Sequence, residues 1–231
     1  MFEPARPRHR TVIRALETLD AEFLERAQCW FGGGTRIVLA LDEYRESADI
    51  DFLCSSRDGY RALRGTVGNR SLGDIGRARL KLAREVIADR YGIRTVLEIG
   101  AEKLKFEIVL EGRIGLMGGF ADGLAVAALD ATSCCAEKFL ANADRWGDES
   151  ALGRDVIDLA FMAAKWGREP LRAGLAIATE AYGKATARDA KRAATKMLER
   201  ADWRRRCVAA LSVSDTRTLL SGLRLITAGR W

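Results

Sequence analysis

Hydrophobic and polar positions follow two different patterns along the chain. From about residue 28 to 117, short runs rich in β-branched and aromatic residues alternate with helical stretches and glycines. From about residue 130 onward, the apolar residues recur almost only at helical spacing. We therefore predict an α+β fold with two domains. Residues 1–128 would form an α/β head, a short mixed sheet with flanking helices, and residues 129–231 an all-helical part.

Within the head, apolar residues at helical spacing predict helices over 11–27 and 71–92, the second ended by Gly92. Residues 35–41 fit a strand by their β-branched side chains and a helix by their position. Strands are predicted for residues 28–31, 49–53, 93–100 and 103–112. Beyond Asp130, helices are predicted near residues 131–145, 152–166, 169–182, 185–200 and 202–226, the last broken near Ser212. We expect the active site where head and helical part meet.

Composition narrows the class of protein and the chemistry available to it. The 231 residues are 48% hydrophobic and 30% charged, which is ordinary for a globular protein. No apolar run reaches the roughly 20 residues that span a bilayer, so we expect no membrane association and a cytoplasmic location. The five cysteines form no CxxC pair and suit reduced thiols. The single histidine, His9, lies in what we expect to be a loose tail, which argues against histidine-based catalysis.

Charge is distributed unevenly along the sequence. Residues 1–152 carry a net charge of −2 and residues 153–231 a net charge of +8, within a total of +6. A basic half of this kind favours an anionic partner such as RNA or DNA. Arginine-rich solvated helix faces would give the same composition, and the sequence does not decide between these alternatives.

Two aspartates separated by one residue interrupt the strand predicted at 49–53. Residues i and i+2 of a strand point to the same face, so Asp49 and Asp51 lie side by side while Ile50 and Phe52 face the core. Neighbouring carboxylates repel and require a positive partner. Helix-terminal amides or an arginine would serve, but a hard divalent cation such as Mg²⁺ is the simplest partner for paired oxygen ligands.

A glycine turn precedes this pair. Gly33 and Gly34 lie between a short strand and a helix expected to begin near Thr35. Such a turn exposes backbone N–H groups that bind phosphate, and the threonine adds a hydroxyl at the cap. A simple tight turn with an N-cap would have the same sequence. Together with the carboxylate pair, however, the turn indicates a site for a metal and a triphosphate.

The stretch GGGTRIVLALDEYRESADIDF resembles the G-G-T…R-x-S-x-D-I-D signature of AbiEii/AbiGii-type nucleotidyltransferase toxins, within the DNA polymerase β-like superfamily. Two later segments extend the resemblance. LKFEIV is similar to the second family strand and carries Glu107, and EKFLANADRWGDESALGRDVIDLAFM is similar to the helical motif E-K…R-D-x-x-D. The positions matched in this sequence are Gly33, Gly34, Thr35, Arg45, Ser47, Asp49, Asp51, Glu107, Glu137, Lys138, Arg154, Asp155 and Asp158.

The resemblance implies transfer of a nucleoside monophosphate from an NTP to an acceptor hydroxyl. Asp49, Asp51 and Glu107 would hold Mg²⁺ or Mn²⁺, with Glu98 on the preceding strand as the competitor for the third position. The nucleotide-binding residues would be Gly33, Gly34, Thr35, Arg45, Ser47 and Lys138. Asp155 would position Lys138 or the acceptor. Arg45 and Ser47 would either orient the loop before the carboxylate strand or touch the nucleotide.

This resemblance and the basic half favour RNA as the acceptor, and tRNA in particular. The resemblance also implies a toxin with an antitoxin partner. A small molecule or a protein hydroxyl is the alternative acceptor, and a non-catalytic nucleotide-binding module is the alternative class. The base preference, the acceptor, the antitoxin and the oligomeric state cannot be read from the sequence.

Overall fold

The structure is a computed structural model that describes residues 3–77, 80–121 and 123–231. The chain divides into two compact units, which we describe separately. Residues 1–39 and 48–130 form a sheet unit, and residues 40–47 and 131–231 form a helical unit. The segment 40–47 thus belongs with the helices, although residues of the sheet unit flank it on both sides. The α+β fold class is confirmed.

A mixed sheet forms the centre of the sheet unit. Its strands follow the order β3-β5-β6-β2-β1-β8-β7, and β4 also pairs with β5. The β2–β6 and β1–β8 pairs are parallel, and the other pairs are antiparallel. The strands are β1 (Cys29–Phe31), β2 (Ile50–Cys54), β3 (Lys81–Leu82), β4 (Ile87–Ala88), β5 (Gly92–Ile99), β6 (Glu102–Leu110), β7 (Gly118–Phe120) and β8 (Ala127–Leu129).

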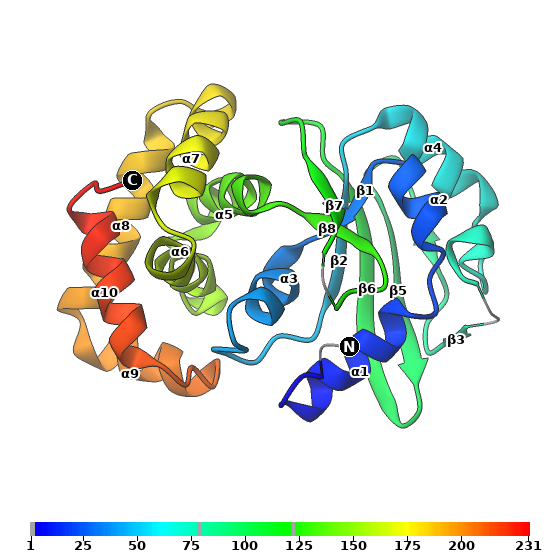
Figure 1. The fold of residues 1–231 in the computed structure, drawn as a ribbon, viewed down its shortest axis with the longest axis horizontal. Coiled ribbons are helices and arrows are strands. Elements are labelled where there is room, and N and C mark those ends of the chain that lie inside the picture. The colour runs from blue at the N-terminus through cyan, green and yellow to red at the C-terminus, as the bar shows by residue number, and fades with distance from the viewer. Residues whose placement is uncertain (1–2, 78–79, 122) are drawn as a thin grey trace. The chain divides into compact units, whose positions relative to one another are not determined.

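Three helices of this unit, α1, α2 and α4, lie on one side of the sheet (Figure 1). Alternation along the strands separates the two faces: Ile50, Phe52 and Phe106 point into the core that these helices cover. Asp51 and Glu107, at the alternate positions, point to the opposite face. The helices of the unit are α1 (Pro7–Leu16), α2 (Ala21–Arg26), α3 (Gly33–Ala40) and α4 (Arg57–Thr66), with a 3₁₀ turn at Gly73–Ile75.

Three predictions for the head were wrong. The helix expected over 11–27 is two helices, because Asp20 caps α2 by accepting the Phe23 N–H at 2.8 Å. The helix expected over 71–92 is replaced, in its described residues, by the 3₁₀ turn and by β3 and β4, which pair with the outer edge of β5. Residues 78 and 79 of that segment lie outside the described residues. His9 is buried on α1 and does not lie in a loose tail.

Most other predictions for the elements were confirmed. The strands at 28–31, 49–53, 93–100 and 103–112 correspond to β1, β2, β5 and β6. Residues 35–41, which suited both a strand and a helix, are helical in α3 up to Ala40. The helices beyond Asp130 are α5 (Ala131–Arg145), α6 (Arg154–Lys165), α7 (Arg168–Tyr182), α8 (Ala185–Glu199), α9 (Ala201–Ala210) and α10 (Thr216–Thr227).

The segment 40–47 is fixed within the helical unit by its backbone and its aromatic ring. Tyr44 stacks on Phe161 of α6, with ring centroids 3.8 Å apart and an interplanar angle of 13°. The Ser214 N–H donates to the Tyr44 carbonyl at 2.8 Å, and the Glu46 N–H donates to the Leu211 carbonyl at 2.9 Å.

Across the described residues, no helix is both long and apolar enough to span a membrane.

Candidate functional site

The glycine turn brings the first group of predicted residues together. Gly33 opens α3 with a φ of +65°, a conformation that favours glycine. A Cβ added at Gly33 would lie 2.3 Å from Oδ2 of Asp51, far inside van der Waals contact. The Asp51 carboxylate therefore lies directly against the glycine backbone at the start of α3, and a larger residue would displace it.

Backbone pairing reinforces this contact. The Gly32 N–H donates to the Asp51 carbonyl at 2.8 Å, so the residue before the helix is tied to β2. Thr35 in the first turn of α3 is fully buried. The first N–H groups of a helix have no partner within the helix and bind anions. The start of α3 thus offers donors to an anion next to an acidic side chain.

Parallel pairing of β2 with β6 places the second carboxylate. Asp51 lies opposite Glu107 in the register, and both side chains point away from the core face. Adjacent strands are about 4.8 Å apart, so these two carboxylates are neighbours on the sheet. Asp49 directly precedes β2 and is half-buried. As the side chains stand, no group of three or more His, Cys, Asp or Glu among the described residues is arranged to hold a metal ion.

Glu107 has a cationic partner that the sequence analysis missed. Arg94 lies opposite Glu107 in the antiparallel β5–β6 pair and donates Nε–H to its Oε1 at 2.5 Å. Glu98, the competing candidate, lies four residues beyond Arg94 on β5. At about 3.3 Å per residue, this places it roughly 13 Å from Arg94 along the strand. It is opposite Lys103 and Lys81. The geometry places Glu107, and not Glu98, beside Asp51.

A second group of predicted residues centres on Asp158 in the helical unit. Asp158 is fully buried on α6. Its Oδ1 accepts the Tyr44 hydroxyl at 2.6 Å and Arg45 Nε–H at 2.7 Å, and its Oδ2 accepts Arg45 Nη2–H at 2.9 Å. Lys138 Nζ lies 2.8 Å from the same Oδ2. One carboxylate therefore joins the segment 40–47 to helices α5 and α6.

Asp155 extends this cluster by one turn of α6. Lys138 Nζ donates to its Oδ1 at 3.0 Å. Arg145 of α5 forms a fork on it, through Nε–H to Oδ2 at 2.6 Å and Nη2–H to Oδ1 at 2.9 Å. Lys138 is buried between the two aspartates. Of the two roles expected for Asp155, the contacts favour positioning of Lys138.

The charges of this cluster stabilise one another. Burial alone would raise the pKa of Asp158, but the Arg45 and Lys138 charges outweigh it and lower that pKa below its ordinary value. Burial alone would likewise raise the pKa of Asp155, but Lys138 and Arg145 outweigh it and lower that pKa. Burial alone would lower the pKa of Lys138, yet the two carboxylates raise it. At neutral pH the cluster holds three cations and two anions.

The contacts of Arg45 bear on its expected role. Its side chain is only 4% exposed. Nε and Nη2 donate to Asp158, and Nη1 donates to the Glu46 carbonyl at 2.8 Å. Its contacts favour the alternative in which it orients the loop before β2 over the one in which it touches the nucleotide. Ser47, two residues later, is half-buried.

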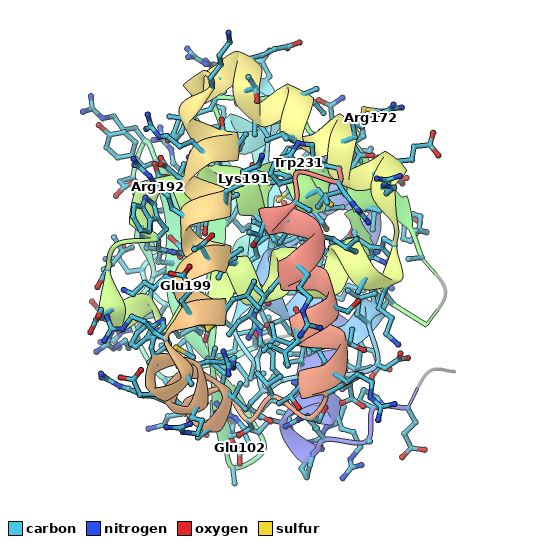
Figure 2. All side chains as sticks on the ribbon, turned by 90° about the vertical axis from the view of Figure 1, so that its left-hand side faces the viewer. Glu102, Arg172, Lys191, Arg192, Glu199 and Trp231 are labelled. Atoms are coloured by element: carbon cyan, nitrogen blue, oxygen red, sulfur yellow. The ribbon has the colours of Figure 1, made fainter. Side chains whose placement is uncertain are left out.

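Basic residues of the tail lie in two different environments. Arg204 donates to the carbonyls of Met197 and Leu198, at 2.9 and 2.8 Å, and so closes the end of α8. Trp203 is a core residue. An open groove of about 760 Å³ runs along α8, and its charged and aromatic lining consists of Trp146, Arg188, Lys191, Arg192, Lys196, Glu199 and Arg200. Figure 2 shows Lys191, Arg192 and Glu199 along this helix.

The predicted site residues therefore form two groups, one in each unit. The sheet unit holds Gly33, Gly34, Thr35, Asp49, Asp51 and Glu107, and the helical unit holds Arg45, Ser47, Lys138 and Asp155. Arg94, Tyr44 and Arg145 were missed. Arg94 could have been found from hairpin geometry, because a two-residue turn at Gly100-Ala101 sets it opposite Glu107. Tyr44 and Arg145 gave no comparable signal.

Comparison with known protein families gives one match that covers most of the chain. The family model described as "Nucleotidyl transferase AbiEii toxin, Type IV TA system" matches residues 14–219 of 231. The matched range includes every residue of both groups. No curated protein matches the chain.

Proposed function

Because the chain belongs to the AbiEii family of nucleotidyltransferase toxins from type IV toxin–antitoxin systems, we propose that it is a metal-dependent nucleotidyltransferase. It transfers a nucleoside monophosphate from an NTP to an acceptor hydroxyl of RNA and releases pyrophosphate. The observation that carries this proposal is the contact of the Asp51 carboxylate with the N-terminus of α3, with Glu107 next to it. An anion cradle and paired acids are what a metal-bound triphosphate requires.

The residues present fit a hard divalent cation. Their donors are carboxylate oxygens, and Asp51 Oδ2 occupies a space that a side chain at residue 33 would fill. Mg²⁺ is usually bound by one or two carboxylates together with substrate phosphates, so it does not need a preformed cage. Asp49, Asp51 and Glu107 would hold Mg²⁺ or Mn²⁺, which would neutralise phosphate oxygens and lower the pKa of the acceptor hydroxyl.

The chain's own groups supply the remaining chemistry. The N–H groups of Gly33 and Gly34 bind phosphate oxygens at the positive end of α3. A contact of the Thr35 hydroxyl with phosphate stays a prediction, since Thr35 is fully buried. Asp51 or Glu107 accepts the proton of the acceptor hydroxyl as the hydroxyl oxygen attacks the α-phosphorus. The bond from this phosphorus to the β-bridging oxygen breaks, and pyrophosphate leaves.

In the helical unit, the Asp158 cluster holds the segment that leads into β2. Asp158 fixes Tyr44 and Arg45 through hydrogen bonds. Arg45 lies four residues before Asp49 in the sequence. We propose that Arg45 acts by fixing this loop. A contact of Lys138 with the NTP phosphates stays a prediction, since Asp155 and Asp158 already engage its ammonium group.

The α8 groove supports RNA as the acceptor. Five cations line it against one lining acid, Glu199. Asp189 pairs with Arg188 and Arg192, which neutralises part of this charge. The guanidinium carbon of Arg192 lies over the face of the Trp146 ring, 6.0 Å from the ring centroid, so the groove also has an aromatic surface. Cations that track phosphates next to an aromatic ring are typical of single-stranded nucleic-acid sites.

The test of the function is transfer of label from each α-labelled NTP to total cellular RNA in the presence of Mg²⁺. We expect label in RNA with the wild type and none with Asp51→Asn, which keeps the side-chain shape but removes a charge. Wild-type transfer by Asp51→Asn would refute the proposed site. Label in protein or in small molecules, but not in RNA, would refute the RNA acceptor and retain the transferase.

A second experiment tests the groove. Replacing both Arg188 and Arg192 by glutamine should weaken tRNA binding and reduce its salt slope by about 2, one for each phosphate that is no longer neutralised. NTP affinity should not change. The matched control is glutamine at Arg168 and Arg172, two exposed arginines of α7 that do not line the groove. Equal tRNA binding by the two double variants would refute the groove.

Family membership also implies an antitoxin as a partner. Type IV toxin–antitoxin systems pair a toxin of this family with an antitoxin. We propose that expression of the chain alone arrests growth, and that Asp51→Asn abolishes the arrest. Growth arrest by the inactive variant would separate toxicity from nucleotide transfer.

A further inference from the structure

A connected set of side chains leads from a tight turn to Glu107. Arg94 lies between two acids: Nε–H donates to Glu107 Oε1 at 2.5 Å, and Nη1–H donates to Asp89 Oδ2 at 3.3 Å. The Arg94 and Glu107 side chains are 39% and 35% exposed. An isolated pair at this exposure would contribute little to stability. The Arg94–Glu107 pair is not isolated, because Arg94 also bonds to Asp89.

The far end of the set is fixed by backbone groups. Asp89 Oδ1 accepts the N–H of Tyr91 at 2.7 Å and of Gly92 at 3.0 Å. These N–H bonds, the Tyr91 bond first, lower the pKa of Asp89, so the carboxylate stays ionised. The Tyr60 hydroxyl of α4 donates to the Asp89 carbonyl at 2.7 Å. Arg94 is therefore held by an acid that is itself anchored.

Close packing around the guanidinium also limits its position. A Cβ at Gly92 would lie 3.0 Å from Arg94 Nη2 and 2.7 Å from the Ile108 carbonyl. A larger residue would push against both the arginine and β6. The absence of a side chain at residue 92 thus lets Arg94 lie along the strand pair towards Glu107.

We propose that Arg94 is a positioning residue for Glu107 in the nucleotidyl transfer. The inference rests on the proposed function. Asp51 and Glu107 lie opposite each other on adjacent strands, and two carboxylates at that spacing repel. Without a partner, Glu107 would turn towards solvent. Arg94 holds Glu107 Oε1 and keeps the carboxylate beside Asp51, which would leave its second oxygen for the cation or for the acceptor proton.

The test uses Arg94→Gln, Arg94→Lys and a matched control in the whole protein. Arg70→Gln removes an exposed arginine of the same unit that pairs with Glu85 at 3.4 Å. We expect Arg94→Gln to lower kcat by about 10- to 100-fold, as loss of partners behind metal ligands does, with KM for the NTP changed less than about threefold. Arg94→Lys should restore part of kcat, because it keeps the charge but lacks the second donor. Arg70→Gln should behave as the wild type.

A second readout does not depend on turnover. The melting temperature is measured with a non-hydrolysable NTP analogue, with and without MnCl₂. The cation-induced rise should be smaller in Arg94→Gln than in the wild type and in Arg70→Gln. The inference is overturned if Arg94→Gln and Arg70→Gln share the same kcat and the same cation-induced rise. It is also overturned if Arg94→Gln lowers only the melting temperature.

The two readouts separate this inference from the proposed function. If the wild type transfers label to no acceptor, the proposed function fails, and the cation-induced rise still decides whether Arg94 positions Glu107. If the wild type is active and Arg94→Gln equals it, only the role of Arg94 fails. Should Arg94→Gln not fold, Arg94→Lys carries both measurements against the same control.

Discussion

Replacing Asp158 by alanine should destabilise the helical unit more than any exposed substitution in it. The change removes the acceptor of the Tyr44 hydroxyl, of two Arg45 donors and of one Lys138 donor. Arg45 would remain buried with one backbone acceptor, the Glu46 carbonyl. Lys138 would keep Asp155.

The expected magnitude follows from these interactions. Removing one partner of a buried ion pair costs about 3–5 kcal/mol, since the remaining charge stays buried. The Tyr44 bond adds to this loss, but bonds to one carboxylate are not additive. We expect a loss of at least about 3 kcal/mol in the free energy of unfolding, against a typical total of about 5–15 kcal/mol.

Urea unfolding followed by tryptophan fluorescence measures this loss, because Trp146, Trp166, Trp203 and Trp231 all lie in the helical unit. The control is Asp202→Ala, because the Asp202 side chain is 71% exposed and its removal should change the free energy of unfolding little. A loss for Asp158→Ala no greater than that of the control, at an unchanged m-value, would refute the buried cluster.

Three further outcomes are expected. Glu107→Gln should lower turnover far more than NTP affinity while Glu98→Gln changes neither, and steady-state kinetics with the reverse result would reassign the third acid. Lys138→Met should destabilise the fold. If Lys138 also touches the NTP, calorimetry on the folded variant should show a loss of about ten- to hundredfold in NTP affinity. An unchanged NTP affinity would mean that Lys138 is a purely structural cation. Because the folded pKa values of Asp155 and Asp158 are depressed, their stabilisation is complete above the unfolded pKa of about 3.9 and is lost as pH falls below it. Urea midpoints between pH 6 and pH 3 should show this loss, and Asp158→Ala should lose less over the same range.

Periodicity predicted the elements whose partners lie nearby or whose patterns are long. The helices of the tail repeat apolar residues over several turns, and their predicted ends agree with the structure to within a few residues. Residues 71–92 also show helical spacing, but β3 and β4 within them satisfy the outer edge of β5. Strand pairing with β5 overrides the helical spacing there, and helical spacing alone carries no information on such pairing.

The candidate site was predictable to the extent that its residues form contiguous motifs. The i, i+2 rule placed Asp51 on the face opposite Ile50, and the structure agrees. The contact of Asp158 with Tyr44 and Arg45 joins residues more than 110 positions apart. No sequence spacing encodes such a contact, so the burial of Arg45 could not be foreseen.

The assignment of segment 40–47 to the helical unit has a consequence for how the chain can be synthesised and divided. Arg45 leaves the ribosome 113 residues before Asp158, its partner. Residues 1–130, which include the whole sheet unit, are synthesised before α6, so Tyr44 and Arg45 are made before Asp158 can pair with them. A fragment that begins near residue 129 would contain all the helices of the helical unit but lack Tyr44 and Arg45, so Lys138 would be the remaining partner of Asp158. Separate expression of the two halves would therefore remove three hydrogen bonds from a buried carboxylate in one half and leave an unanchored loop in the other. Circular permutation near residue 43 would preserve the pairing only if the new ends leave Tyr44 and Arg45 intact.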